Sequence, residues 1–150
     1  MLDDVYYMGL ALEEARLAMN KNEVPVGAII VLDDKIIASA HNQRESLQDP
    51  LAHAEISAIK QAAKEIGSWR LENADMYVTL EPCPMCAGAI IQSRIKRLIY
   101  GARDYKNGAH VSKTNLFHID FTHHVEVLSG VLEEKSSRML KDFFKTLRNR

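Results

Sequence analysis

Residues 77–88 read Tyr-Val-Thr-Leu-Glu-Pro-Cys-Pro-Met-Cys-Ala-Gly, a stretch in which a strand pattern is followed directly by a helix pattern. The apolar run over residues 75–80 predicts a short buried strand. Residues 84–92 predict a helix, because Pro84 stands where a proline is tolerated, in the first turn. A strand followed at once by a helix is typical of α/β domains, and here the connection between them carries two cysteines.

Outward from this stretch, helical and strand patterns alternate along the chain. Apolar residues recur at helical spacing or gather in short β-branched runs. Helices are expected over residues 4–19, 52–66 and 131–147, and strands over residues 26–32, 35–40, 97–101 and 125–128. Residues 102–120 are expected to form a loop. The alternation predicts an α/β domain in which helices cover a central sheet, and it leaves the strand order open.

The composition indicates one folded domain over residues 1–150. Hydrophobic residues make up 47% of the chain, enough for one buried core, and charged residues make up 26%. The formal net charge is −1, so any nucleic-acid partner needs a local basic patch. No segment approaches ~20 consecutive apolar residues, and the first residues are acidic. We therefore expect a cytoplasmic protein without a membrane partner.

Cys83 and Cys86 are the only cysteines of the sequence. A disulfide between them would close a loop too short to stabilise a fold much, and a reducing compartment disfavours it. The pair is therefore a metal site or a redox dithiol. His53 and Glu55 stand at the start of one expected helix, as the two cysteines stand at the start of another. The positive end of each helix dipole favours thiolates, the form in which cysteine binds metal.

One imidazole and two thiolates match a tetrahedral zinc ion with one position left for water. A structural zinc site would have four protein ligands, and a redox dithiol would need neither His53 nor Glu55. We therefore expect a catalytic zinc ion bound by His53, Cys83 and Cys86. Glu55 lies two residues from His53, so it can move protons at the open position without being a ligand. This His-x-Glu and Pro-Cys-x-x-Cys signature is the one known from zinc-dependent nucleobase deaminases.

The chain resembles the cytidine-deaminase-like superfamily over nearly its whole length, and within it the bacterial tRNA-specific adenosine deaminases. The zinc signature is common to the superfamily, whereas the flanking segments are similar to those of the tRNA enzymes. These segments include Glu23-Val-Pro-Val-Gly-Ala28, His41-Asn-Gln-Arg44, Gly67-Ser-Trp-Arg-Leu71 and Tyr100-Gly-Ala-Arg-Asp104. The resemblance implies a three-layer α/β/α sandwich with a mixed central sheet. It also implies a homodimer, with one zinc ion per subunit, that converts the wobble adenosine of a tRNA anticodon loop to inosine.

The resemblance implies substrate-side roles for further residues. Asn42 matches an asparagine that hydrogen-bonds the flipped base, and Asp104 matches an acidic residue beside the backbone of the extruded nucleotide. Lys106, close to Asp104 in the sequence, is also expected to bind substrate. Residues 109–114 depart from the family pattern. This departure concerns the loop on the RNA side and leaves the zinc chemistry unchanged.

The C-terminal helix is the one place where charge gathers toward one sign, and we expect it to contact tRNA. Its basic residues are Lys135, Arg138, Lys141, Lys145, Arg148 and Arg150. Four more basic residues can extend the patch: Lys96, Arg97, Arg103 and Lys106. Of Phe143 and Phe144, one is expected to pack inward and the other to border the RNA site. A run of charge is also common on helix faces that only meet solvent.

Two other functions fit part of the pattern. A guanine or cytidine deaminase acting on a free base or nucleoside would share the zinc site, but it has no use for a basic C-terminal helix. A non-catalytic zinc module would have no use for Glu55 beside an open coordination position. The expected substrate is therefore a tRNA, with tRNA-Arg as the first species to test. Trp69 is expected to anchor packing, and the histidines at 110, 118, 123 and 124 are expected on a loop surface.

Overall fold

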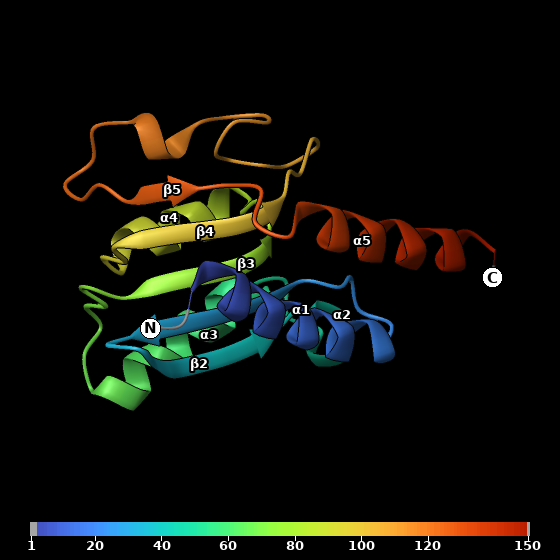
Figure 1. Ribbon diagram of the computed structural model, residues 1–150, viewed down its shortest axis with the longest axis horizontal. Coiled ribbons are helices and arrows are strands. Elements are labelled where there is room, and N and C mark those ends of the chain that lie inside the picture. The colour runs from blue at the N-terminus through green and yellow to red at the C-terminus, as the bar shows by residue number, and fades with distance from the viewer. Residues whose placement is uncertain (1–2, 150) are drawn as a thin grey trace.

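A mixed five-stranded sheet forms the centre of the computed structural model, which describes residues 3–149. The strands are β1 (Gly27–Leu32), β2 (Lys35–His41), β3 (Asp75–Leu80), β4 (Arg97–Ala102) and β5 (Glu126–Leu128). Their order is β2-β1-β3-β4-β5 (Figure 1). β1 is antiparallel to both of its neighbours, whereas β3, β4 and β5 are parallel to one another.

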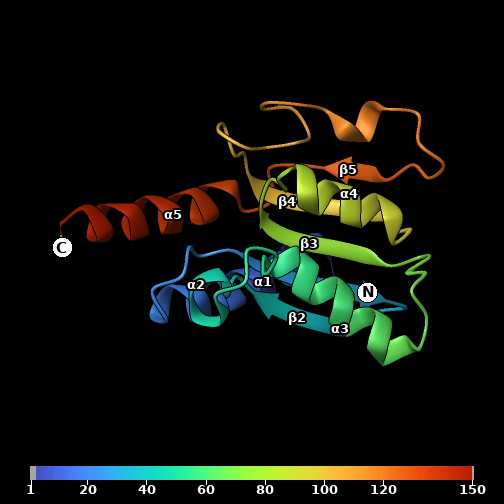
Figure 2. The same cartoon turned by 180° about the vertical axis from the view of Figure 1, so that it is seen from behind.

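Helices cover both faces of this sheet. They are α1 (Asp4–Asn20), α2 (Arg44–Leu47), α3 (Ala54–Ile66), α4 (Pro84–Gln92) and α5 (Glu133–Arg148), with a 3-10 helix η1 over Leu116–His118. α1 and the first part of α5 lie on one face, and α3 and α4 lie side by side on the other (Figures 1 and 2). The expected three-layer α/β/α sandwich with a mixed sheet is confirmed.

Each face of the sheet has its own buried apolar cluster. Side chains of α3 and α4 pack with Ile30, Met76 and Leu98 on one face. Side chains of α1 pack with Ile29 and Tyr77 on the other face. Successive residues of a strand point to opposite faces, so a strand covered on both faces is apolar throughout. This explains the continuous apolar run over residues 26–32 of the sequence.

Four strands end at the same edge of the sheet. β2 and β3 are both antiparallel to β1, so β2 points in the same direction as β3, β4 and β5. The segments that follow β2, β3 and β4 therefore meet at one edge, where α3 and α4 begin (Figure 2). Ligands of α/β sheets bind at this carboxyl edge of the parallel strands.

The helices and strands expected from the sequence are all present, with small shifts at their ends. The helix expected from residue 52 begins at Ala54, because His53 is its N-cap residue. α2 and η1 are single short turns, too short to show a hydrophobic period in the sequence. Within residues 3–149, none of the helices has the length and apolar content needed to cross a membrane.

Trp69 does not anchor packing: its side chain is 57% exposed, and the guanidinium groups of Arg70 and Arg94 lie over its ring. The expectation is wrong because Trp69 follows the glycine that ends α3, in a connection that runs over the surface. Arg150, expected as part of the basic helix, lies outside the described residues.

Candidate zinc site and active site

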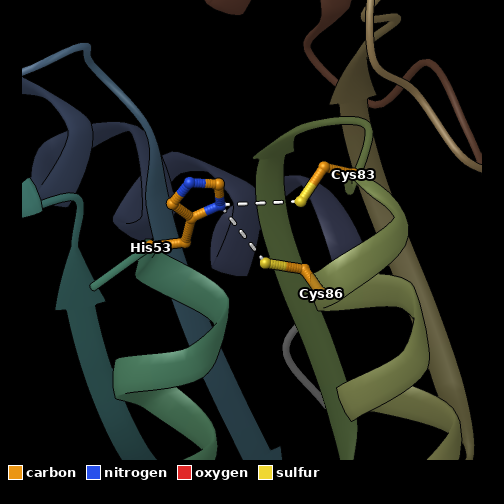
Figure 3. Close-up of side chains that lie close together, drawn as sticks. All are labelled: His53, Cys83 and Cys86. Atoms are coloured by element: carbon orange, nitrogen blue, oxygen red, sulfur yellow. Dashed lines mark hydrogen bonds between the residues drawn. The ribbon is translucent and has the colours of Figure 1, made fainter. Parts of the chain in front are cut away.

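The N-termini of two helices bring His53, Cys83 and Cys86 together. His53 is the N-cap residue of α3, and Cys83 is the N-cap residue of α4, with Pro84 in the first turn. Because α3 and α4 pack against each other on one face of the sheet, their first turns are neighbours (Figure 3). Free backbone N–H groups and the positive ends of the two helix dipoles favour anionic thiolates at this position.

The three side chains converge as the ligands of one metal ion would. The Nδ1 atom of His53 lies 3.4 Å from Sγ of Cys86 and 3.6 Å from Sγ of Cys83 (Figure 3). All three ligand atoms lie within 4.8 Å of one another. Tetrahedral zinc with bonds of about 2.0–2.3 Å places ligand atoms roughly 3.4–3.8 Å apart, so this donor set fits zinc. Among the described residues, no second group of three or more histidine, cysteine or acidic side chains is close enough to hold an ion.

Hydrogen bonding within this cluster separates the pKa values of the two thiols. The Cys86 thiol donates to the sulfur of Cys83, which lowers the pKa of Cys83 to about 4. The same hydrogen bond, together with burial, raises the pKa of Cys86 far above its usual value. The hydrogen bond with Cys83 also raises the pKa of His53. A metal ion would replace the shared protons, because only thiolates and a neutral imidazole act as ligands.

Glu55 is buried beside the three ligand atoms. Only 4% of the residue is exposed, and its carboxyl group interacts with the thiol of Cys86. Burial raises the pKa of Glu55 to about 7, because the charged form loses its hydration. A carboxyl group whose pKa lies near neutrality can both accept and release a proton at that pH. The buried position of Glu55 beside the three ligand atoms therefore suits it to proton transfer at this site.

Asn42 follows β2 directly and lies at the carboxyl edge of the sheet. Its Nδ2 donates to the backbone oxygen of Val24, and its Oδ1 accepts from the backbone N–H of Arg44. The backbone N–H of Gln43 donates to the oxygen of Ala52, which ties this segment to the start of α3. The side chain of Asn42 thus holds the turn after β2, and its contact with a base stays a prediction.

Asp104 and Lys106 lie on the loop that follows β4, at the same edge. The Oδ1 atom of Asp104 accepts hydrogen bonds from the backbone N–H groups of Lys106 and Asn107, which closes a tight turn. Lys106 is exposed, and so is Tyr105 beside it. Contact of Asp104 or Lys106 with substrate also stays a prediction.

Two buried carboxylates hold the loops of this edge, and the sequence reasoning missed both. Glu23 accepts hydrogen bonds from the backbone N–H groups of Glu45 and Ser46 and from the Ser46 hydroxyl group. Glu81, at the end of β3, accepts hydrogen bonds from the loop after β4. One signal in the sequence could have revealed this role for Glu81: it is an acidic residue that directly follows a strand expected to be buried.

The basic surface is smaller than the sequence suggests. Arg97 is not available to it, because its guanidinium group is paired with Asp4 and Asp75. Phe143 is buried and Phe144 is 40% exposed, which confirms that one of the two packs inward. The basic residues of α5 that the structure describes are all exposed: Lys135, Arg138, Lys141, Lys145 and Arg148.

The four histidines of the C-terminal third have separate side-chain hydrogen-bond partners. The partners of His110, His118, His123 and His124 are, in that order, Tyr100, Asn115, the backbone oxygen of Ile95, and Asp120. These contacts belong to loop packing and do not bring the four rings to one point.

Comparison with known proteins shows the family. The sequence profile of the MafB19-like deaminase family matches residues 2–148. The tRNA-specific adenosine deaminase of Bacillus subtilis (strain 168) is 50% identical over 151 residues, which span 100% of this chain and 94% of that protein. The chain belongs to the MafB19-like deaminases, among the tRNA-specific adenosine deaminases.

Solved structures place this deaminase in the same group. A structure from work on tRNA:A34 deaminases is 48% identical, with a TM-score of 0.87, and the match covers 90% of this chain and 99% of that one. The guanine deaminase of Nitrosomonas europaea has a TM-score of 0.83 but only 22% identity, with 95% of this chain and 85% of that chain covered. The second likeness shows the fold alone.

Proposed function

We propose that the chain is a zinc-dependent hydrolytic deaminase that converts the wobble adenosine of a tRNA anticodon loop to inosine. One observation carries the proposal. The ligand atoms of His53, Cys83 and Cys86 converge beside the buried carboxyl group of Glu55, in a chain 50% identical to a tRNA-specific adenosine deaminase. The reaction consumes one water molecule, leaves an oxygen on C6 of the base and releases ammonia.

His53, Cys83 and Cys86 would hold the zinc ion, one per subunit. When bound, zinc supplies Lewis acidity, which lowers the pKa of water so that it can attack C6 at neutral pH. Three protein ligands suit such a catalytic ion, because a fourth would close the site to water. The Nδ1 atom of His53 lies close to the sulfur atoms of both cysteines, which supports a metal site with three ligands over a redox dithiol.

Glu55 would move the protons of the reaction. Its carboxylate takes a proton from the attacking water and delivers it to N1 of the adenine ring. A second transfer through the same carboxyl group protonates the amino nitrogen on C6, after which the C–N bond breaks and ammonia leaves. The position of Glu55 supports this role, because its buried carboxyl group lies beside the ligand atoms without being one of them.

The RNA side of the site is inferred from position and charge. Asn42 would hydrogen-bond the extruded base, Asp104 and Lys106 would meet its backbone, and the exposed basic residues of α5 would contact phosphates. A base in an anticodon loop is unpaired, so little stacking energy opposes its extrusion. We also propose a homodimer that acts in the cytoplasm, with tRNA-Arg as its first substrate to test.

The test is inosine formation from a tRNA-Arg anticodon stem-loop with adenosine at the wobble position, scored by mass. The zinc-loaded protein should form inosine, and Glu55→Ala should lose at least about 10²–10⁴-fold in rate because no group transfers the protons. The variant should keep one zinc ion per chain, since Glu55 is not a ligand. Glu65→Ala, on the exposed end of the same helix, is the matched control and should retain activity.

Two results would contradict the proposal. Full activity of Glu55→Ala with zinc bound would remove the proton-transfer role. Absence of inosine with the wild-type protein, zinc-loaded and folded, would exclude this substrate and direct the assay to guanine and cytidine as free substrates.

A further inference from the structure

Glu81 holds the loop after β4 through five hydrogen bonds, although only 1% of the residue is exposed. Its Oε1 accepts from the backbone N–H of Asp104 at 3.1 Å and from the hydroxyl group of Ser112. Its Oε2 accepts from the backbone N–H groups of His110 at 2.9 Å, Val111 at 3.0 Å and Ser112 at 3.2 Å. Both ends of the loop over residues 104–112 are thus bound to one carboxylate.

The same carboxylate joins this loop to the turn that carries the zinc ligands. Glu81 and Pro82 directly precede Cys83 in the sequence. The backbone N–H of Ala109 donates to the oxygen of Pro82 at 2.8 Å, so the loop is bound to two consecutive residues of this turn. The position of the 104–112 loop relative to Cys83 therefore depends on Glu81.

Gly108 leaves the space that the Glu81 carboxylate occupies. A Cβ atom at Gly108 would lie 2.3 Å from Cδ and 2.4–2.5 Å from the two carboxylate oxygens. Atoms do not approach this closely, so a side chain at this position would push the carboxylate away from its donors. Gly108 has no positive φ, so the missing side chain, and not backbone freedom, is what the packing requires.

The arrangement requires a carboxylate and not merely a polar group. Burial acts to raise the pKa of Glu81, but the hydrogen bonds from Ser112, Val111 and His110 outweigh it and hold the pKa below its usual value. A carboxylate can accept all five hydrogen bonds, whereas an amide has one acceptor oxygen. With glutamine at 81, the amide oxygen can accept hydrogen bonds from the three N–H groups of residues 110–112. Its NH₂ group then lies opposite the N–H of Asp104, and two donors cannot form a hydrogen bond with each other.

We infer that Glu81 is a positioning residue that holds Asp104 and Lys106 on the substrate side of the zinc-binding turn. Asp104 connects Glu81 to Lys106. Its backbone N–H donates a hydrogen bond to Glu81, and its side chain accepts one from the backbone N–H of Lys106 and so closes the turn that carries Lys106. The inference rests on the proposed function, since this loop has a use only if a nucleic-acid substrate reaches the site. Loss of the hydrogen bond between Glu81 and Asp104 should weaken substrate binding and leave the zinc ligands in place.

Two substitutions test this inference from opposite sides of the same contact. Glu81→Gln keeps the shape of the side chain and removes one acceptor, and Gly108→Ala displaces the carboxylate. Gly9→Ala is the matched control for the added methyl group, because nothing lies within 4 Å of a Cβ at Gly9. For each protein we would measure KM and kcat on the anticodon stem-loop, zinc per chain, and hydrogen exchange of the backbone amides over 104–112.

Glu81→Gln should raise KM by about five- to tenfold, the effect of one hydrogen bond, with kcat within about twofold of the wild type. Gly108→Ala should raise KM further, and Gly9→Ala should leave KM unchanged. Zinc should stay at one ion per chain, and the amide of Asp104 should exchange faster in both loop variants. This split between KM and kcat is not what a loss of overall stability would produce.

Three outcomes would overturn the inference. Unchanged exchange at Asp104 in Glu81→Gln would show that Glu81 does not hold the loop, whatever the substrate is. Faster exchange with unchanged KM would show that the loop takes no part in binding. Loss of zinc and of kcat with unchanged KM would assign Glu81 to the metal site. Absence of inosine with the wild-type protein would instead refute the proposed function, and the exchange measurement would still decide whether Glu81 holds the loop.

Discussion

At the scale of single residues, the edge of the sheet is built around buried acids that differ in their hydrogen-bond donors. Glu23 and Glu81 each accept hydrogen bonds from a serine hydroxyl group and from backbone N–H groups, and together these hydrogen bonds outweigh burial and lower the pKa of both carboxyl groups. Glu55 lies on the first turn of α3, and burial dominates there, so its pKa rises to about 7. The same side chain therefore serves as a fixed anion at two positions and suits proton transfer at the third.

The protonation of the ligand cluster predicts how zinc binding depends on pH. The pKa of Cys86 is raised far above its usual value, so this thiol carries a proton near neutrality that zinc must displace, and the raised pKa of His53 adds to the competition between protons and zinc. We expect about one to two protons to be released per zinc ion at pH 7, and zinc affinity to fall as the pH is lowered. Calorimetric titrations in two buffers of different ionisation enthalpy measure this number. A release of zero protons would show that the cluster is already deprotonated.

At the scale of elements, α5 differs from the other long helices because only its first part packs on the sheet. Its second half extends away from the sheet toward the C-terminus (Figures 1 and 2). Phe143 is buried, whereas Phe144 and Leu147 are 40% and 46% exposed. Exposed aromatic and basic side chains on one projecting helix favour contact with nucleic acid, because phosphates attract the charges and bases stack on rings.

Reversal of charge on this half of α5 should weaken tRNA binding more than it affects the chemistry. We expect Lys141→Glu, Lys145→Glu and Arg148→Glu together to lower affinity and to reduce the slope of log K against log salt by about 0.7–0.9 per lost phosphate contact. Fluorescence anisotropy with a labelled stem-loop over a range of salt concentrations measures both. The control carries the same number of charge reversals at three exposed lysines away from α5, Lys35→Glu, Lys60→Glu and Lys64→Glu. An equal loss in the control would mean that net charge, and not this helix, decides binding.

At the scale of the whole molecule, the proposed zinc ligands His53 and Cys83 come from two segments that are 30 residues apart in the sequence. An ion bound there would cross-link α3 and α4 on one face of the sheet. It would therefore stabilise the folded chain as well as supply reactivity, because the unfolded chain does not hold the three ligands together.

Removal of zinc should lower the unfolding temperature. At a zinc concentration about 1,000 times Kd, binding adds about 4 kcal/mol to the free energy of unfolding. For a chain of this size that corresponds to roughly 10 °C in Tm. Differential scanning fluorimetry before and after treatment with a chelator, and again after zinc is restored, measures the change. Glu55→Ala should show the same shift as the wild type, and an unchanged Tm on chelation would argue against zinc that links the two helices.

Local signals were enough to predict the longer helices, the strands and the candidate reactive residues from the sequence. Hydrophobic periods marked the strands and helices, Gly67 ends α3 as a left-handed C-cap residue, and Pro84 marks the start of α4. The first turns of α3 and α4 also carry the candidate reactive residues, which are His53 and Glu55 on α3 and Cys83 and Cys86 on α4. Their chemistry could therefore be inferred from spacing along the chain alone.

Tertiary structure alone decided which distant residues meet. The parallel direction of β2, β3 and β4 brings Asn42, Cys83 and Asp104 to one edge of the sheet, and no local pattern specifies that direction. Glu81 meets donors more than 20 residues further along the chain, and Arg97 meets an acid 93 residues before it. Such partners depend on how the strands are ordered and packed. For this reason the candidate zinc ligands could be predicted from the sequence, whereas only the fold shows what holds the loops after β2 and β4 around them.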